Sequence, residues 1–444
     1  MNILVMGMGY VGITTALMLA ESGWTVTGYD VDERKISSLK QGVVPFFEPG
    51  LDALLSQHLN SGQLHVTSSV KSAIKQNQVI FLCVGTPSLD DGSPDLKYIH
   101  SAAESIARYM QEYKLIVVKS TVPIGTNGRL TEWIASHQIS AVPFDVVSNP
   151  EFLREGSALY DSLHPDRIVI GTDHKCAARQ MRTIYNAINA PILITEPKTA
   201  EMIKYASNAF LATKISYMNE LARLCDTLQI HIDDVAKGMG MDHRIGAHFL
   251  KAGIGYGGSC FPKDINALLN TASGHQHRLT ILEQVVQVNN TQHAFYLDKW
   301  EEIVGGFRNK NVAVFGLSFK PDTDDLRESP SLSMISSLIS KRASVKVHDP
   351  VAKLPAQLSS SPVEQCDSID EAVTGADAII LCTDWNHYKY ADWSRIHSLM
   401  KHPFLFDGKN ALNRREMEVA GFHYFGIGQP YETHKLTSRS QLLP

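Results

Sequence analysis

The first part of the chain alternates short runs of Val, Ile and Leu with segments of helical periodicity. Apolar runs of this length suit strands that are buried on both faces. Alternation with helices is typical of βαβ units, which build a parallel sheet. The predicted strands are Asn2–Met6, Trp24–Tyr29, Gln78–Val84, Leu115–Lys119, Phe144–Ser148 and Arg167–Gly171, with Pro191–Thr195 as a further candidate.

The pattern becomes helical over Thr199–Leu228, where apolar residues from Met202 to Leu224 recur at helical spacing. Neither Gly nor Pro interrupts this stretch. A second helical stretch covers about Thr280–Ile303. We therefore predict a helical middle section that contains one long amphipathic helix.

The last part of the chain repeats the first at reduced length. Its apolar runs Asn311–Gly316, Ala343–Asp349 and Asp377–Thr383 correspond to Asn2–Gly7, Thr25–Asp30 and Gln78–Gly85. We predict a second Rossmann-like unit here. Its first turn, Gly316–Lys320, lacks the glycine spacing of the first copy, so we expect it to bind something other than a dinucleotide pyrophosphate.

Together these patterns predict an α/β protein with two Rossmann-like, doubly wound parallel-sheet domains joined by a central helical section with a long helix. A chain of 444 residues is long enough for two or three domains. The boundaries that we predict are 1–196, 197–305 and 306–444.

Composition narrows the class of protein. With 44% hydrophobic and 20% charged residues, the chain has no apolar stretch near the ~20 residues of a membrane span, and no basic leader at its start. We expect a cytoplasmic protein with no membrane partner. A net charge of −5 argues against general nucleic-acid binding.

The six cysteines show no CxxC pair and no zinc-site spacing, so we predict neither disulfides nor a metal.

A glycine motif, Gly7-Met8-Gly9-Tyr10-Val11-Gly12, follows the first strand and opens a helix. Such glycines allow a tight turn, and the helix N-terminus offers free N–H groups to a pyrophosphate. Asp30 ends the next strand, where a carboxylate binds the ribose hydroxyls of adenosine and repels a 2′-phosphate. The motif predicts NAD binding; a glycine turn that binds no nucleotide is the alternative.

Two further turns follow strands of the predicted sheet, Gly85-Thr86-Pro87 and Ser120-Thr121-Val122-Pro123. Ligands of open parallel sheets bind at this edge. Helix capping is the alternative for Ser120 and Thr121. Because they share an edge with the glycine loop, we favour cofactor contact.

The segment Gly255–Asp264 reads Gly-Tyr-Gly-Gly-Ser-Cys-Phe-Pro-Lys-Asp. Glycines bring the Cys260 thiol close to a ligand, Lys263 favours the thiolate, and Asp264 orients or deprotonates a water. A lone cysteine is usually packing, but one in this setting is a candidate nucleophile. We place these residues in a turn.

Polar residues in two other places are candidates for the same chemistry. Lys204 and Asn208 lie four apart on the long helix and could stabilise an oxyanion, with a solvated face as the alternative. Glu151 and Glu155 follow a strand end within Asn149–Gly156, and their alternative is a role as helix N-terminal acids.

Seven motifs, in the order in which they occur along the chain, match those of a known family. The chain resembles the nucleotide-sugar 6-dehydrogenases of the UDP-glucose/GDP-mannose dehydrogenase family over nearly its whole length. The matching motifs are Gly7–Gly12, Val84–Pro87, Ser120–Pro123, Asn149–Glu155, Lys204 with Asn208, Gly257–Asp264, and Phe319-Lys320 with Arg327-Glu328-Ser329.

The resemblance implies a four-electron oxidation of UDP-glucose at C6 to UDP-glucuronate, with NAD used twice and a thiohemiacetal and a thioester formed on Cys260. It makes 1–196 the NAD-binding domain, 197–305 a central dimerisation domain and 306–444 a UDP-sugar-binding domain. By matching positions, the catalytic residues would be Cys260 as nucleophile, Lys204 and Asn208 for oxyanions, Asp264 for proton transfer and hydrolysis, and Thr121, Glu151 and Glu155 for ordering water or contacting ligand.

The resemblance also implies ligand contacts. NAD would contact Gly7, Gly9, Tyr10, Val11, Gly12, Asp30, Lys35, Thr86, Thr121, Glu155, Lys263 and Arg327. The sugar nucleotide would contact Glu151, Phe152, Leu153, Glu155, Lys204, Asn208, Phe249, Leu250, Lys251, Gly253, Tyr256, Gly257, Phe319 and Lys320. Arg244 would reach the site from a neighbouring subunit, which implies at least a homodimer.

Three alternatives stay open. The first is a GDP-mannose 6-dehydrogenase, because these enzymes have a similar Gly-Gly-Ser-Cys segment. Phe261 and the Gly253–Tyr256 segment of this chain nevertheless resemble the UDP-glucose enzymes more. A UDP-N-acetylmannosamine dehydrogenase typically departs from Phe-Pro-Lys-Asp after the cysteine. From another class, an NAD-binding regulatory protein would keep Cys260 for packing alone. Lys409 stands where the family often has Arg, which affects substrate contacts more than the reaction.

Overall fold

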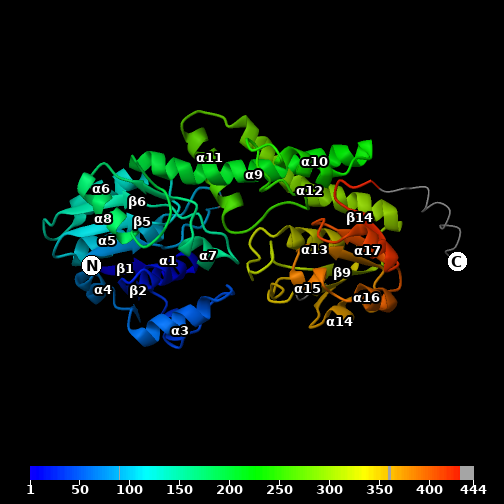
Figure 1. Cartoon of the computed structure of the whole chain (residues 1–444), viewed down its shortest axis with the longest axis horizontal. Helices are drawn as coiled ribbons and strands as arrows, with labels where there is room; N and C mark the ends of the chain where they lie inside the picture. Colours follow the sequence, from blue (N-terminus) through cyan, green and yellow to red (C-terminus); the bar gives the residue numbers. More distant parts are fainter. Residues whose placement is uncertain (90, 359–361, 431–444) are drawn as a thin grey trace. The chain divides into compact units, whose positions relative to one another are not determined.

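The computed structural model describes residues 1–89, 91–358 and 362–430. The chain separates into two compact units, each interrupted in sequence. The first unit comprises Met1–Asn208 and Lys263–Arg278, and the second comprises Ala209–Pro262 and Leu279–Pro444. Each contains one α/β sheet (Figure 1).

The first sheet has the strand order β3-β2-β1-β4-β5-β6-β7-β8. All neighbouring pairs are parallel except β6 and β7, which are antiparallel. Every strand predicted for this part is present, while β3 was not predicted. The strands are β1 (Asn2–Met6), β2 (Thr25–Tyr29), β3 (Leu64–Thr67), β4 (Val79–Leu82), β5 (Lys114–Val118), β6 (Phe144–Ser148), β7 (Ile168–Gly171) and β8 (Ile192–Thr195).

Helices cover both faces of this sheet because successive strand residues point to opposite sides. Ile3 and Val5 pack on one side with residues of α1, α3 and α8, whereas Leu4 and Met6 pack on the other with residues of α4, α5 and α6. The helices are α1 (Tyr10–Glu21), α2 (Glu33–Lys40), α3 (Leu51–Ser61), α4 (Val70–Gln76), α5 (Lys97–Tyr109), α6 (Thr126–His137), α7 (Ala158–Leu163) and α8 (Lys175–Ile184).

The second sheet repeats this winding with the parallel order β11-β10-β9-β12-β13-β14. The predicted second Rossmann-like unit is therefore confirmed. Its strands are β9 (Asn311–Phe315), β10 (Ser344–His348), β11 (Val363–Gln365), β12 (Ala378–Leu381), β13 (Phe404–Asp407) and β14 (His423–Gly426). Its helices are α13 (Pro330–Ser340), α14 (Ile369–Val373), α15 (Asn386–Lys389), α16 (Trp393–Leu399) and α17 (Arg414–Val419).

The predicted long helix is α9, which covers Pro197–Leu228, and α12 covers Thr280–Val304. Between them lie α10 (Ile232–Gly240) and α11 (Phe261–Gly274). The division into two units falls within α9, after Asn208. The three domain boundaries stay predictions, and residues 431–444 of the third domain lie outside the described residues. Among the described helices, none combines the length and apolar character that a membrane crossing requires.

Candidate active site

The glycine loop joins β1 to α1, and each of its glycines has a different environment. A Cβ on Gly12 would lie 1.7 Å from the Gly7 carbonyl oxygen, so a side chain there cannot fit. Gly9, by contrast, faces open space, and no side chain caps the N-terminus of α1. The backbone N–H groups at this helix end are thus available to an anion such as a pyrophosphate.

Asp30 lies directly after β2, beside the glycine loop. Its Oδ2 accepts hydrogen bonds from the Met8 N–H and from Lys35 Nζ, both at 2.8 Å. Burial would raise the pKa of Asp30, but the Lys35 ammonium and the N–H groups of Asp32 and Met8 outweigh burial and lower it. An ionised carboxylate at this place suits the ribose hydroxyls of NAD.

The second Rossmann-like unit has an aspartate at the equivalent place, Asp349, directly after β10. Here the loop backbone occupies the carboxylate. Oδ2 accepts from the N–H groups of Leu317 and Ser318, and Oδ1 accepts from those of Val351 and Ala352. Asp30 accepts the N–H groups of Met8 and Asp32 in a similar way, so the second unit differs from the first in the glycine spacing of its turn and in the Lys35 contact that Asp30 makes in addition.

The turns after β4 and β5 are linked to each other. Thr86 donates its hydroxyl to the Thr121 carbonyl oxygen at 2.8 Å, and the Ser120 hydroxyl lies 2.6 Å from the Val84 carbonyl oxygen. The next helix, α6, begins only at Thr126 and has Gly125 as its N-cap. Ser120 and Thr121 therefore do not cap α6, and the hydroxyls of Thr86 and Ser120 tie the two turns together.

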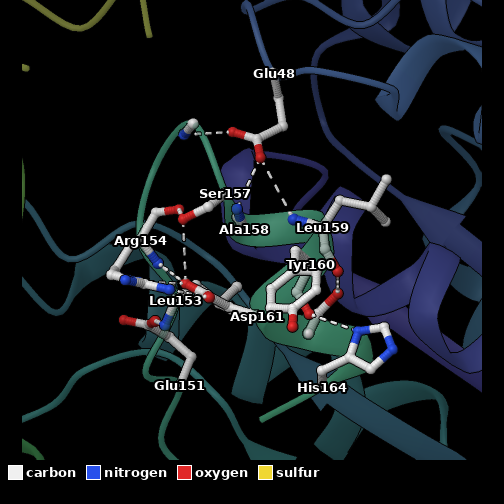
Figure 2. A network of polar contacts seen from close by, with 12 residues as sticks. Glu48, Glu151, Leu153, Arg154, Ser157, Ala158, Leu159, Tyr160, Asp161 and His164 are labelled. Atoms are coloured by element: carbon white, nitrogen blue, oxygen red, sulfur yellow. Dashed lines mark hydrogen bonds and ion pairs between the residues drawn. The ribbon is translucent and has the colours of Figure 1, made fainter. Parts of the chain in front are cut away.

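Glu151 and Lys204 form a buried ion pair, with Oε1 and Nζ 2.7 Å apart. The other Glu151 oxygen accepts the Leu153 N–H at 2.6 Å (Figure 2). Burial would raise the pKa of Glu151, but Lys204 and this N–H lower it. The nearest helix, α7, starts at Ala158, so Glu151 and Glu155 are not acids of its first turn. Lys204 is not on a solvated face, since it is buried.

Asn208, Asp264 and Lys263 form a second polar cluster of the first unit. Asn208 Nδ2 donates to Asp264 Oδ2, and Lys263 Nζ donates to Oδ1, both at 2.6 Å. Asp264 is only 1% exposed. A carboxylate that is buried and held on both oxygens has a fixed orientation.

Lys263 and Asp264 lie on the first turn of α11 and not in a turn as predicted. The sequence did contain a signal for this helix. Pro262 and Asp264 follow Ser259, and proline and acidic residues are favoured in a first helical turn. The glycines before Cys260 obscured that signal. Cys260 itself directly precedes the helix, with Ser259 Oγ 3.6 Å from its sulfur.

The glycines before Cys260 are needed for packing within the second unit. A Cβ on Gly257 would lie 2.1 Å from the Glu328 carbonyl oxygen. Gly258 has φ +87°, and its Cβ would lie 2.7 Å from the Phe319 ring. The Gly258 N–H donates to the Arg327 carbonyl oxygen at 2.8 Å. The structure thus brings the cysteine loop against the Phe319–Ser329 segment, two of the motifs noted in the sequence.

Three side-chain amides that were not predicted as site residues hold the segment that precedes the cysteine loop. Asn219 of α9 accepts the Gly253 N–H, Gln292 of α12 donates to the Gly253 carbonyl, and Asn289 bonds both backbone groups of Tyr256. Polar residues on amphipathic helices carry no local signal for such a role, because it depends on which loop packs against them. They hold the predicted substrate residues in a defined path.

Three further charged residues of the predicted site have partners in their own unit. Arg327 pairs with Asp325 at 2.7 Å, Lys251 with Asp384 at 3.5 Å, and Arg244 with Asp242 at 2.6 Å. The Arg244 side chain is 78% exposed, so a neighbouring molecule could reach it.

Lys119 is a further residue that sequence reasoning missed. It follows β5, and its Nζ lies 3.3 Å from Asn149 Oδ1, which also accepts the Tyr185 hydroxyl at 2.5 Å. Burial lowers the pKa of Lys119 to about 8, against a weaker opposite effect of Cys83 and Glu151. This cluster anchors the start of the Asn149–Gly156 segment.

Comparisons with known proteins agree with this geometry. Three models of the UDP-glucose/GDP-mannose dehydrogenase family match the chain: the NAD binding domain at residues 1–189, the central domain at 198–291 and the UDP binding domain at 313–414. The UDP-glucose 6-dehydrogenase YwqF of Bacillus subtilis is 44% identical over 430 residues, which cover 97% of this chain and 98% of that protein.

Two further proteins show the same relationship. A UDP-glucose 6-dehydrogenase of Rhizobium meliloti is 43% identical over 97% of this chain and 100% of its own length. Among solved structures, a UDP-glucose dehydrogenase from the archaeon Pyrobaculum islandicum superimposes with a TM-score of 0.89 at 37% identity, over 96% of this chain and 98% of that one.

Proposed function

Because the chain belongs to the UDP-glucose/GDP-mannose dehydrogenase family and is an NAD-dependent oxidoreductase, we propose that it oxidises UDP-glucose at C6 to UDP-glucuronate. The observation that carries the proposal is the loop of Cys260, whose glycines pack against Phe319 and Glu328 directly before α11. A thiol at this place supports covalent catalysis, which provides a route for the second oxidation of a four-electron sequence.

The first unit fits the cofactor. Gly9 leaves open space at the N-terminus of α1, and Asp30 is held ionised beside it. Bound NAD⁺ supplies the hydride acceptor, and the balanced reaction converts one alcohol, two NAD⁺ and one water into one carboxylate, two NADH and three protons. The glycine loop and Asp30 bind and orient it, together with Lys35, Thr86, Thr121, Glu155, Lys263 and Arg327.

Cys260 is the nucleophile. Its sulfur forms a bond to the C6 aldehyde carbon, and the carbonyl oxygen takes up a proton, which gives a thiohemiacetal. Oxidation of this adduct gives a thioester on Cys260. Water then adds to the carbonyl carbon, the C–S bond breaks, and the thiol is regenerated as the carboxylate leaves.

Four polar residues assist this sequence. Lys204 and Asn208 stabilise negative charge on the substrate oxygen, because both carry N–H donors held by buried carboxylates. Asp264 takes part in proton transfer and hydrolysis. Glu151 orders water or contacts ligand, as do Thr121 and Glu155.

The sugar nucleotide is bound by the segments that precede Cys260 and follow β9. The proposed contacts are Glu151–Leu153, Phe249–Lys251, Gly253, Tyr256, Gly257, Phe319 and Lys320. The protein acts as a homodimer in which Arg244 contributes to the site of the neighbouring subunit. Its exposed position supports this assignment.

UDP-glucose is favoured over GDP-mannose for two reasons. Curated relatives that are 40–44% identical over nearly the whole chain carry the name UDP-glucose 6-dehydrogenase. In addition, Phe261 and the Gly253–Tyr256 segment resemble the UDP-glucose enzymes more than the GDP-mannose enzymes, and the Phe261 ring contacts those of Phe249 and Tyr256 at centroid distances of 6.2 and 5.9 Å.

The test is the number of NADH molecules formed per UDP-glucose consumed with excess NAD⁺, with GDP-mannose run in parallel. Two NADH per UDP-glucose are expected. Two NADH from GDP-mannose and none from UDP-glucose would keep the mechanism and change the substrate. NAD binding without NADH from any sugar nucleotide would instead favour a regulatory protein.

A further inference from the structure

Glu48 is a buried carboxylate outside the proposed chemistry that joins two distant parts of the first unit. It lies in the turn before α3 and is 6% exposed. Its oxygens accept hydrogen bonds from three backbone N–H groups and one hydroxyl. A carboxylate in this setting is fully satisfied, and its partners are held in one arrangement.

One oxygen of Glu48 holds the start of α7. Oε1 accepts the N–H of Ala158 at 2.7 Å and that of Leu159 at 3.4 Å (Figure 2). Ser157 occupies the N-cap position, but its side chain makes no capping hydrogen bond. Glu48 therefore supplies, from a position 110 residues earlier, the acceptor that a local cap would normally provide.

The other oxygen of Glu48 contacts the glycine loop. Oε2 accepts the Tyr10 hydroxyl and, at 2.6 Å, the N–H of Gly156. Tyr10 is the first residue of α1 and directly follows Gly9. Burial and the hydrogen bond to Glu48 raise the pKa of Tyr10, so its hydroxyl keeps the proton that it donates.

The segment between these contacts carries the two glutamates of the proposed site. Glu151 is held by Lys204 at one end. Arg154 is held by Asp161, which accepts from its backbone N–H, Nε and Nη2 at 2.9, 2.9 and 2.6 Å. Glu155 lies directly between Arg154 and Gly156, so the contacts of Asp161 and Glu48 hold the backbone on both sides of this residue.

We propose that Glu48 is a positioning residue that couples NAD binding at the glycine loop to the placement of Glu151 and Glu155. Tyr10 also contacts this segment directly, since the Gly156 N–H donates to the Tyr10 hydroxyl oxygen at 2.8 Å as well as to Glu48. The Glu48 carboxylate adds a second link from Tyr10 to Gly156 and extends it to α7. The role of the two glutamates rests on the proposed function, whereas the link from the glycine loop to this segment does not.

The first test is hydrogen–deuterium exchange of residues 151–163 in the full-length protein with and without NAD⁺, which needs no turnover. NAD⁺ is expected to slow exchange of these amides at least about fivefold in the wild type and less than about twofold in Glu48→Gln. The glutamine offers one acceptor oxygen in place of two and turns an NH₂ group toward N–H donors.

Asp407→Asn is the matched control. Asp407 is also a buried carboxylate, and it accepts three backbone N–H groups and the Tyr424 hydroxyl, but in the second sheet. This variant is expected to lose stability while NAD⁺ still protects residues 151–163. Equal protection in wild type and Glu48→Gln, or its loss in Asp407→Asn as well, would overturn the proposal.

The second test is a double-mutant cycle with Tyr10→Phe and Glu48→Gln. Each change is expected to lower kcat about tenfold, because displaced catalytic groups lose alignment, and the double variant should be little worse than Glu48→Gln. Additive losses, or losses that only follow the folded fraction, would contradict the coupling. If the wild type forms no NADH from any sugar nucleotide, the proposed function fails and the exchange measurement alone decides the coupling.

Discussion

At the scale of single residues, burial and pairing with Lys204 have opposite effects on the ionisation of Glu151. Burial disfavours the carboxylate, whereas Lys204 at 2.7 Å favours it, and the lowered pKa of Glu151 shows that pairing prevails. The sign of the resulting pH dependence follows directly. A carboxyl with a depressed folded-state pKa adds stability above its ordinary pKa of 4.5, and this stability is lost as pH falls through the folded value.

Lys204→Ala is therefore expected to destabilise the protein by about 3–5 kcal/mol at pH 7, because it leaves a buried charge without its partner. In this variant burial raises the pKa of Glu151, so acid relieves the penalty. The stability gap to wild type, measured by urea unfolding, should narrow between pH 7 and about 4.5. Adding Glu151→Gln should recover part of the loss, and a gap that does not change with pH would refute the assignment.

Cys260→Ala is expected to abolish net turnover and leave NAD binding nearly unchanged, since the thiol belongs to covalent chemistry and the glycine loop to binding. The measurements are UDP-glucuronate formation and NAD titration by protein fluorescence. Cys176→Ala is the control, because Cys176 is an exposed thiol on α8. Normal uronate production by Cys260→Ala would exclude the thioester route.

Whether a site residue could be predicted depends on how close to it in sequence its partner residues lie. The Gly7–Gly12 loop, Asp30 and Cys260 are marked by short spacing within one βα unit or loop. The contact of Asn208 with Asp264 spans 56 residues, and that of Glu48 with Gly156 spans 108. Such pairings depend on how the units fold, and no local pattern records them.

At the scale of elements, the path of the cysteine loop depends on Gly258. Its φ of +87° is in the left-handed region, and a Cβ there would meet the Phe319 ring. Gly258→Ala combines a backbone cost of about 1–2 kcal/mol with a displaced ring. Relief of the backbone strain shifts the loop next to Cys260, and relief of the contact displaces the Phe319 ring.

Gly258→Ala is expected to lower kcat/KM for UDP-glucose at least about tenfold while NAD affinity stays within about twofold. Steady-state kinetics and NAD titration measure the two effects. Gly62→Ala is the matched control, since Gly62 has φ +74° but nothing within 4 Å of a Cβ. An equal effect of both variants would show that strain alone, and not contact with Phe319, is responsible.

Most predicted elements are those in which burial gives a continuous apolar run, but β11, β13 and β14 of the second sheet were not predicted, and β13 has such a run. The strands of both sheet centres and α9 fall in this group. The strand β3 was missed because His65 interrupts its apolar pattern, whereas β4, β7 and β8, which are equally short, have continuous apolar runs. The reversal between β6 and β7 was also unpredicted, since strand direction depends on the connection between strands and not on their composition.

At the scale of the whole molecule, the role of Arg244 can be tested by mixing two inactive forms. Arg244→Ala and Cys260→Ala are each expected to be weakly active or inactive alone. In a mixed dimer, one site combines an intact Cys260 with the intact Arg244 of the other subunit. Random exchange should restore about a quarter of wild-type activity, since half of the dimers are mixed and each has one complete site.

Activity is measured after subunit exchange, and light scattering gives the mass of the assembly. A mixture that stays as inactive as its components would show that Arg244 does not act across subunits. Recovery without a dimer in solution would contradict the proposed assembly.

The first unit is built from two separate stretches of the chain, Met1–Asn208 and Lys263–Arg278, and the ribosome synthesises them at different times. A nascent chain that has not yet reached residue 263 already carries all strands of the first sheet, the glycine loop and Asp30. It lacks Lys263 and Asp264, which join this unit only with Lys263–Arg278. Since domains fold from the N-terminus as the chain emerges, the glycine loop and Asp30 can adopt their folded arrangement before Lys263, Asp264 and Arg327 are synthesised. The contact between Asn208 and Asp264 therefore forms later than the glycine loop in the synthesis of the chain.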